Sequence, residues 1–143
     1  MRASQKIDLI ENAMTKGNFT KEMVTDYLYM LKSDRYQIVP GCTAVVYISA
    51  SDRENGINIA IMFASIDRAI DEEPTYQITK SLNSICKVGR FEINQNKQVG
   101  LVDTFNDGII FDPHAVVDHF RKMVNAIIFQ LDKFQDYTWI YNF

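Results

Sequence analysis

The sequence contains few of the residues that build disulfide or metal-held frameworks. Among its 143 residues, two are cysteine and two are histidine. Cys42 and Cys86 lie far apart without metal-type spacing, so we expect two reduced, buried thiols rather than a disulfide. His114 and His119 fall on a predicted helix, where a five-residue separation turns them roughly 140° apart. That angle is unsuited to sharing one ion, and we expect no metal and no cofactor.

Long apolar runs and basic clusters are also missing. A membrane-spanning helix needs about 20 consecutive apolar residues, whereas the apolar runs here extend over only a few residues. The first thirty residues have the pattern of a charged helix rather than a signal peptide. Fifteen Lys and Arg residues against eighteen Asp and Glu give a net charge of −3, and phosphate binding needs clustered cations. We therefore expect a cytoplasmic protein that binds neither membranes nor nucleic acids.

The composition is nevertheless sufficient for a substantial core. Hydrophobic residues make up 47% of the chain and aromatic residues 12%. A chain of this length buries roughly 68–70% of its unfolded surface on folding. Because no repeat, low-complexity segment or linker interrupts the sequence, we expect a single domain over residues 1–143, ending in an aromatic tail over 136–143.

Hydrophobic periodicity predicts four helices and four strands. The helices are expected over 4–15, from a Thr20 N-cap to about 32, over about 71–87, and from Pro113 onward behind an Asp112 N-cap. The last helix has an apolar seam of Val117, Phe120, Val124, Ile127, Leu131 and Phe134. Strands are expected over 43–49, 57–66, 89–94 and 98–105, and each successive pair is expected to be antiparallel. The predicted class is α+β, an antiparallel sheet with N-terminal, middle and C-terminal helices packed on it.

Aromatic residues near the C-terminus mark a candidate surface for a partner or a second copy. Phe129 lies off the apolar seam of the last helix, where water would normally be. The tail adds Trp139, Tyr141 and Phe143, and so apolar a tail is expected to be covered. It either folds back over its own domain or contributes to a subunit interface, and the two outcomes are compatible.

No catalytic signature is present. Cys42 lacks a nucleophile elbow, and His114 with Asp118 forms an i,i+4 pair typical of a helix surface. The acidic run 71–73 is explained as a helix start, and the cations Lys87, Arg90 and Lys97 as a solvated edge. Isolated glycines at 89 and 100 predict bulges or close backbone approach. A small enzyme using His114 or Cys42 remains a third hypothesis, behind two binding functions.

Part of the chain resembles a known family. The segments Ser81–Ile93, Gln98–Val102 and Gly108–Pro113, which lead into the long apolar helix, resemble the YbjN-like bacterial proteins, whose fold is shared with type III secretion chaperones. A helix with Leu82 and Asn83, a hairpin, a short lead-in and a final helix follow in the family's order over about 75–135. The first half is similar only in its order of elements. The aromatic tail and the longer N-terminal region depart from the family.

The resemblance implies a function in binding rather than in chemistry. It implies a small acidic cytosolic protein, a homodimer, that holds an extended segment of another polypeptide or acts as a stress or sensory regulator. An open sheet edge is compatible with this function because it can accept an added strand. The first hypothesis is therefore a non-enzymatic, chaperone-like adaptor or regulator. The second is an immunity-type protein that neutralises a specific toxin.

Overall fold

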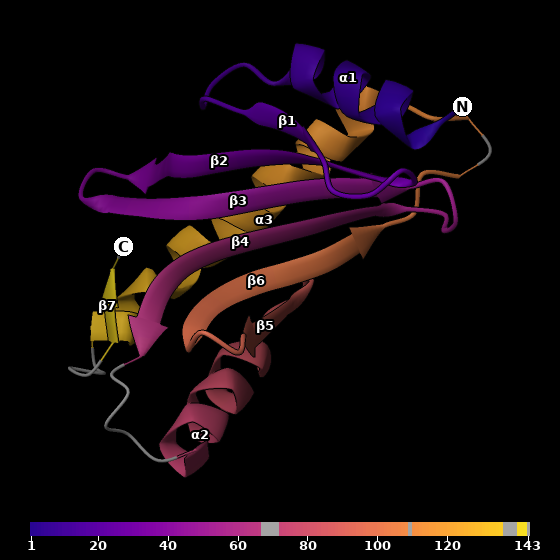
Figure 1. The fold of residues 1–143 in the computed structure, drawn as a ribbon. Coiled ribbons are helices and arrows are strands. Elements are labelled where there is room, and N and C mark those ends of the chain that lie inside the picture. Colours follow the sequence, from indigo (N-terminus) through magenta and orange to yellow (C-terminus); the bar gives the residue numbers. More distant parts are fainter. Residues whose placement is uncertain (67–71, 109, 136–139, 143) are drawn as a thin grey trace.

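The computed structural model describes residues 1–66, 72–108, 110–135 and 140–142. The chain combines one sheet with three helices (Figure 1). In chain order, the elements are α1 (Ala3–Ala13), β1 (Thr20–Met23), β2 (Leu28–Val39), β3 (Cys42–Ser51), β4 (Ile57–Ile66), α2 (Glu72–Asn83), β5 (Arg90–Ile93), β6 (Gln98–Phe105), α3 (Pro113–Gln135) and β7 (Ile140–Asn142).

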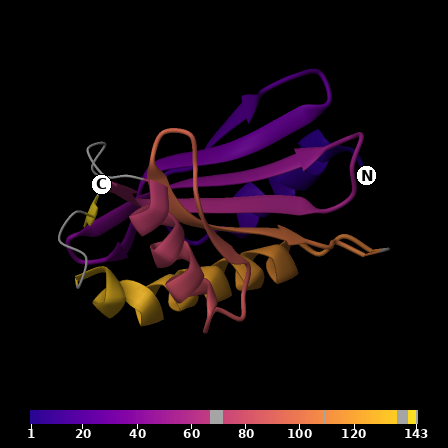
Figure 2. The same cartoon turned by 90° about the horizontal axis from the view of Figure 1, so that it is seen from below.

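The strands form one antiparallel sheet in the order β1-β2-β3-β4-β6-β5, and β7 pairs with the end of β4. Helices α1 and α3 contact each other and pack against the sheet, α1 on β2 and β3, and α3 on β2, β4 and β6. Helix α2 contacts β5 at the sheet edge. Figure 2 shows α3 running along the sheet and α2 lying across it. This architecture confirms the predicted α+β class.

The core lies between the sheet and the two helices. Side chains alternate between buried and half-buried along β3, as a strand with one covered face requires. The predicted seam of α3 supplies Val117, Phe120, Val124 and Ile127, which are all buried. The facing side chains come from α1, β3 and β4, and the largest are Ile7, Ile10, Ile48, Ile57, Ile59, Ile61 and Phe63. Among the helices of the described residues, none combines the length and apolar character needed to cross a membrane.

The helix predicted over about 20–32 is wrong. This segment forms β1, a turn and the beginning of β2. In the turn, the Thr25 hydroxyl oxygen accepts hydrogen bonds from the backbone N–H groups of Tyr27 and Leu28, at 3.3 and 3.1 Å. Leu28 and the following residues then pair with β3 from the register Leu28↔Ser51 onward. Long-range strand pairing thus overrides the helical spacing of Met23, Tyr27, Leu28 and Leu31.

The middle helix is shorter than predicted, ending at Asn83 rather than near residue 87. The Asn83 side chain accepts a hydrogen bond from the Phe91 N–H at 2.7 Å and donates one to the Phe91 carbonyl at 3.0 Å. Ile85, expected on the apolar face of the helix, lies beyond its end and is exposed. Asp71 of the acidic run lies outside the described residues. Asn83 therefore ends the helix and ties it to β5.

The second hairpin and the start of α3 agree with the sequence patterns. Strands β5 and β6 pair from Arg90↔Val102 to Ile93↔Val99. The Asp112 carboxylate accepts a hydrogen bond from the His114 N–H at 3.0 Å, which is the predicted N-cap. At Gly100, an added Cβ would lie 2.5 Å from the Ile61 carbonyl oxygen. The close backbone approach predicted there is confirmed.

Candidate functional site

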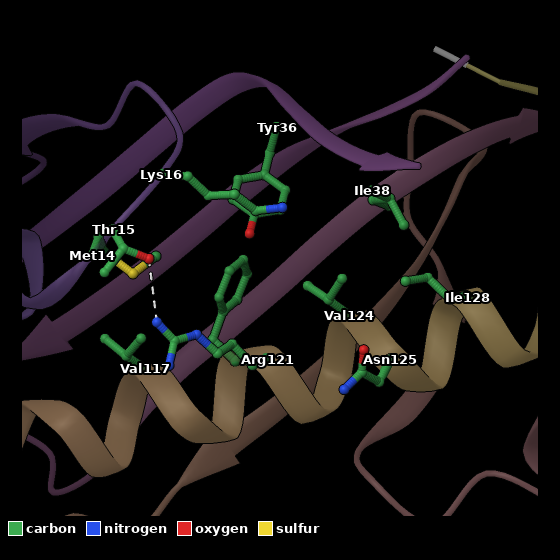
Figure 3. Close-up of a pocket in the computed structure, with 11 residues that line it drawn as sticks. Met14, Thr15, Lys16, Tyr36, Ile38, Val117, Arg121, Val124, Asn125 and Ile128 are labelled. Carbon is green, nitrogen blue, oxygen red and sulfur yellow. Dashed lines mark hydrogen bonds between the residues drawn. The ribbon is translucent and has the colours of Figure 1, made fainter. Parts of the chain in front are cut away.

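A cleft of about 270 Å³ opens between α3, β2 and residues 14–16 (Figure 3). Its apolar lining comes from Met14, Ile38, Val117, Phe120, Val124 and Ile128. Its polar lining comes from Thr15, Lys16, Tyr36, Arg121 and Asn125. An apolar floor with a few polar groups around it is the usual composition of a binding pocket.

The turn after α1 and an aromatic cluster give the cleft its shape. Gly17 has a φ of +92°, and a Cβ there would lie 2.9 Å from the Tyr36 ring, so only glycine lets the chain pass this close. The Tyr36 ring packs edge-on against Phe120, with ring centroids 5.2 Å apart. The Phe19 ring is tilted against Tyr36 and edge-on to Phe120, with ring centroids 6.1 and 6.5 Å away. These aromatic contacts hold β2 against α3 and fix the floor of the cleft.

Two cationic side chains, Arg121 and Lys16, line the cleft. The Arg121 guanidinium donates a hydrogen bond to the Thr15 hydroxyl at 3.2 Å and lies 3.4 Å from the Asp118 carboxylate. The Lys16 ammonium lies 5.3 Å from the centroid of the Tyr36 ring. Among the described residues, Lys16 has no carboxylate partner. The cleft is therefore locally positive in a chain whose net charge is −3.

The Tyr36 hydroxyl is a polar group of the cleft wall. The residue as a whole is 4% exposed, and no hydrogen bond joins its hydroxyl to another described residue. Figure 3 shows this hydroxyl pointing toward α3. Burial raises the pKa of Tyr36, and the nearby Arg121 guanidinium opposes this shift only in part. At neutral pH the cleft thus presents a protonated phenol that can donate a hydrogen bond.

Strand β2 has an open edge beside the cleft. Strand β1 covers only the first part of β2, from Tyr29 to Lys32. The part of β2 from Ser33 to Val39 pairs with β3 on one side and with no described strand on the other. Tyr36 and Ile38 belong to this open part and also line the cleft. Main-chain hydrogen-bonding groups and an apolar cavity therefore lie next to each other.

The opposite face of the sheet carries a wider hollow of about 700 Å³, in which Tyr47, Ala60 and Val102 lie in one cross-strand row. Four of its polar side chains form two pairs. Arg90 pairs with Glu92, and the Thr104 hydroxyl lies 2.7 Å from the Asn58 amide oxygen. Because these groups already have partners, the cleft at α3 is the better candidate site.

The four aromatic residues predicted as a partner or dimer surface are only partly placed. Phe129 projects from α3 and is 74% exposed, and the adjacent Ile128 is 39% exposed. Tyr141 lies in β7, where its backbone pairs with Ser65. Trp139 and Phe143 lie outside the described residues. The backbone of the tail returns to its own sheet at β7, while the use of these residues in an interface stays a prediction.

The candidate catalytic residues lie apart from the cleft. Cys42 is buried in the core, burial raises its thiol pKa, and both cysteines are free. His114 is exposed at the start of α3. No local sequence pattern indicates the contact between His119 Nε2 and Asp103 Oδ2 at 2.6 Å, which joins α3 to β6. Within the described residues, no three His, Cys, Asp or Glu side chains gather as metal ligands do.

The comparisons with known proteins give no relative for this chain: no protein-family model, no curated protein and no solved structure matches it.

Proposed function

We propose that this chain is a non-enzymatic protein-binding module, a chaperone-like adaptor or a stress or sensory regulator of the cytoplasm. The observation that carries the proposal is the open edge of β2 beside the apolar cleft. An extended segment of another polypeptide adds to β2 between Ser33 and Val39 through main-chain hydrogen bonds. The cleft takes one of its side chains, which provides selectivity.

Two other places on the rim of the sheet support this choice. At β5, the Asn83 side chain already occupies the N–H and carbonyl groups of Phe91. At the end of β4, strand β7 pairs with residues 64–66. Proteins usually block their sheet edges against unwanted pairing. An edge left open beside a cavity is consistent with a place reserved for a partner.

The order of elements supports kinship with the YbjN-like proteins and the type III secretion chaperones. The observed sequence of a helix, strands, a second helix, a hairpin and a long final helix is the order that the resemblance implies. The strand β7 is an addition to that order. We carry over the binding function and the fold, and no functional residue.

We also propose that the working form is a homodimer. Phe129 and Ile128 lie next to each other on the exposed side of α3. A twofold interface uses the same patch on both subunits, so two α3 helices crossing at this point would cover both patches.

Replacing Phe129 with Ser tests the homodimer. Because Phe129 is 74% exposed in the single chain, we expect unchanged stability of the monomer but weaker association. Sedimentation velocity over a range of concentrations measures the association. Lys122→Ser, also on the exposed surface of α3, is the control. A native protein that stays monomeric at all concentrations would contradict the homodimer and leave the binding function intact.

Selection from a library of short random peptides tests the binding function. We expect bound peptides to slow amide hydrogen exchange at the open part of β2 and to leave β5 unchanged. Peptides that protect other strands, or a library without binders, would contradict the proposal. A single tightly bound protein, with no binding of isolated peptides, would favour the toxin-neutralising alternative.

A further inference from the structure

We infer that the cleft between α3 and β2 selects a partner segment in which an apolar side chain stands next to a carboxylate. The inference rests on the proposed function, because it names the kind of polypeptide that would occupy the open edge of β2. It assigns the apolar side chain to the floor of the cleft and the carboxylate to Arg121, Lys16 and the Tyr36 hydroxyl.

The floor of the cleft fits one apolar side chain. Phe120 and Val117 are buried beneath it, and Ile38 closes it on the β2 side. The volume of about 270 Å³ lies below the range of roughly 300–1,000 Å³ usual for cofactor and drug-sized ligands. The size therefore favours one anchoring side chain over a bound cofactor.

The cations are available for an incoming carboxylate. The side chains of Arg121 and Asp118 are 52% and 66% exposed, and their 3.4 Å contact is screened by water. A partner carboxylate in the cleft would meet the planar Arg121 guanidinium in a less hydrated place, where a two-pronged hydrogen bond is stronger. Lys16, without a carboxylate partner among the described residues, adds a second positive charge. A basic segment would be repelled by both.

The Tyr36 hydroxyl adds a neutral hydrogen-bond donor to the two cations. Tyr36 lines the cleft, its hydroxyl points toward α3, and no hydrogen bond joins that hydroxyl to a described residue. A carboxylate oxygen of the bound segment could therefore accept a hydrogen bond from it. The cleft thus offers a carboxylate two charged donors and one neutral donor.

Directed peptide libraries test the inference with the full chain. Each library has randomised flanks around a fixed central pair, Leu-Glu in one and Leu-Gln, Leu-Lys or Ser-Glu in the others. We expect the tightest binders from Leu-Glu to have Kd values about tenfold or more below those from the other libraries. A hydrogen bond to a charged group contributes this much, and so does the burial of a Leu side chain. Equal affinities across the four libraries would overturn the inference.

Three variants locate the selectivity. Arg121→Gln is expected to abolish the preference for Leu-Glu over Leu-Gln, whereas Lys122→Gln, its neighbour outside the cleft lining, is expected to preserve it. Tyr36→Phe is expected to weaken Leu-Glu binding while keeping the melting temperature of the free protein, because no hydrogen bond joins the hydroxyl to a described residue. A merely structural hydroxyl would lower that temperature instead. An unchanged preference in Arg121→Gln would overturn the inference.

The outcomes separate this inference from the proposed function. Peptides that protect the open part of β2 without any preference for a carboxylate would leave the function standing and remove the selectivity. Failure of all libraries, random and directed, would remove both. Binding in the cleft without protection of β2 would retain the selectivity and overturn the strand addition.

Discussion

Two side chains that are neutral at pH 7 make the stability of this protein sensitive to alkaline pH. Burial raises the pKa of the Cys42 thiol and of the Tyr36 phenol. For an acid whose folded pKa is raised, the stabilisation is complete below its unfolded pKa and is lost as pH rises through the folded pKa. The unfolded values are about 8.5 for Cys and about 10 for Tyr. We therefore expect stability to decrease progressively above about pH 8.5.

Urea unfolding at neutral and at alkaline pH measures this loss. Cys42→Ala is expected to remove the earlier part of the decrease and Tyr36→Phe the later part. Cys86→Ala is the matched control, because Cys86 is only half-buried. A midpoint that stays constant into the alkaline range would show that these two groups are not desolvated in the folded protein.

The exposure of a helix residue can be predicted from the sequence, but a contact between distant segments cannot. The exposure of Phe129 follows from its angle on the helix, which the sequence alone provides. Tyr36 and Arg121 meet only because β2 and α3 pack together. Their contribution to one cleft depends on a tertiary contact that no local pattern encodes. The pairing of His119 with Asp103 was missed for the same reason.

At the scale of elements, a buried ion pair fixes α1 to the segment before α3. The Lys6 ammonium contacts the Asp107 carboxylate, and their side chains are 15% and 6% exposed. Removing one partner of such a pair leaves a buried charge uncompensated and typically costs about 3–5 kcal/mol. We expect Asp107→Asn to lower the free energy of unfolding by an amount in this range.

Chemical denaturation measures that change. Replacing both partners, as Lys6→Met with Asp107→Leu, is expected to restore much of the loss, because apolar substitutes need no compensation. Glu92→Gln breaks the exposed pair with Arg90 and is expected to change stability by less than about 1 kcal/mol. Equal effects of the two single substitutions would contradict the argument.

Helices and strands with a clear local sequence pattern could be predicted, whereas a strand that depends on pairing with a distant strand could not. Strands β3 and β4, the β5–β6 hairpin and the start of α3 agree with alternation, turn residues and the Asp112 cap. The helix predicted over about 20–32 covers β1, the turn and the first residues of β2, because Met23, Tyr27, Leu28 and Leu31 follow a helical spacing. The long register of β2 with β3, from Leu28↔Ser51 to Val39↔Cys42, decides the conformation. The conformation of β2 therefore depends on β3, and the residues of β2 alone do not predict it.

At the scale of the whole molecule, some edges of the sheet are covered and others are open. Asn83 closes β5, and β7 closes the end of β4. The second part of β2 remains open beside the cleft. The outer side of β1 also has no described strand partner. It is the cleft beside the second part of β2, together with the open edge, that marks this part as the binding surface. We therefore expect that uncovering the edge of β4 causes association of the chain, whereas a peptide that occupies the open part of β2 does not.

Deleting residues 137–143 uncovers the protected edge at β4. The deletion removes β7 and leaves Ala64, Ser65 and Ile66 without a partner on that side. We expect a lower melting temperature and a hydrodynamic size that increases with concentration, because an unpaired strand end accepts other chains. Sedimentation velocity and thermal unfolding measure both effects, and Phe129→Ser in the truncated chain shows whether the new association uses the α3 surface. Persistence of the association in that variant assigns it to the β4 edge, whereas a truncated protein with native size and melting temperature would show that β7 protects nothing.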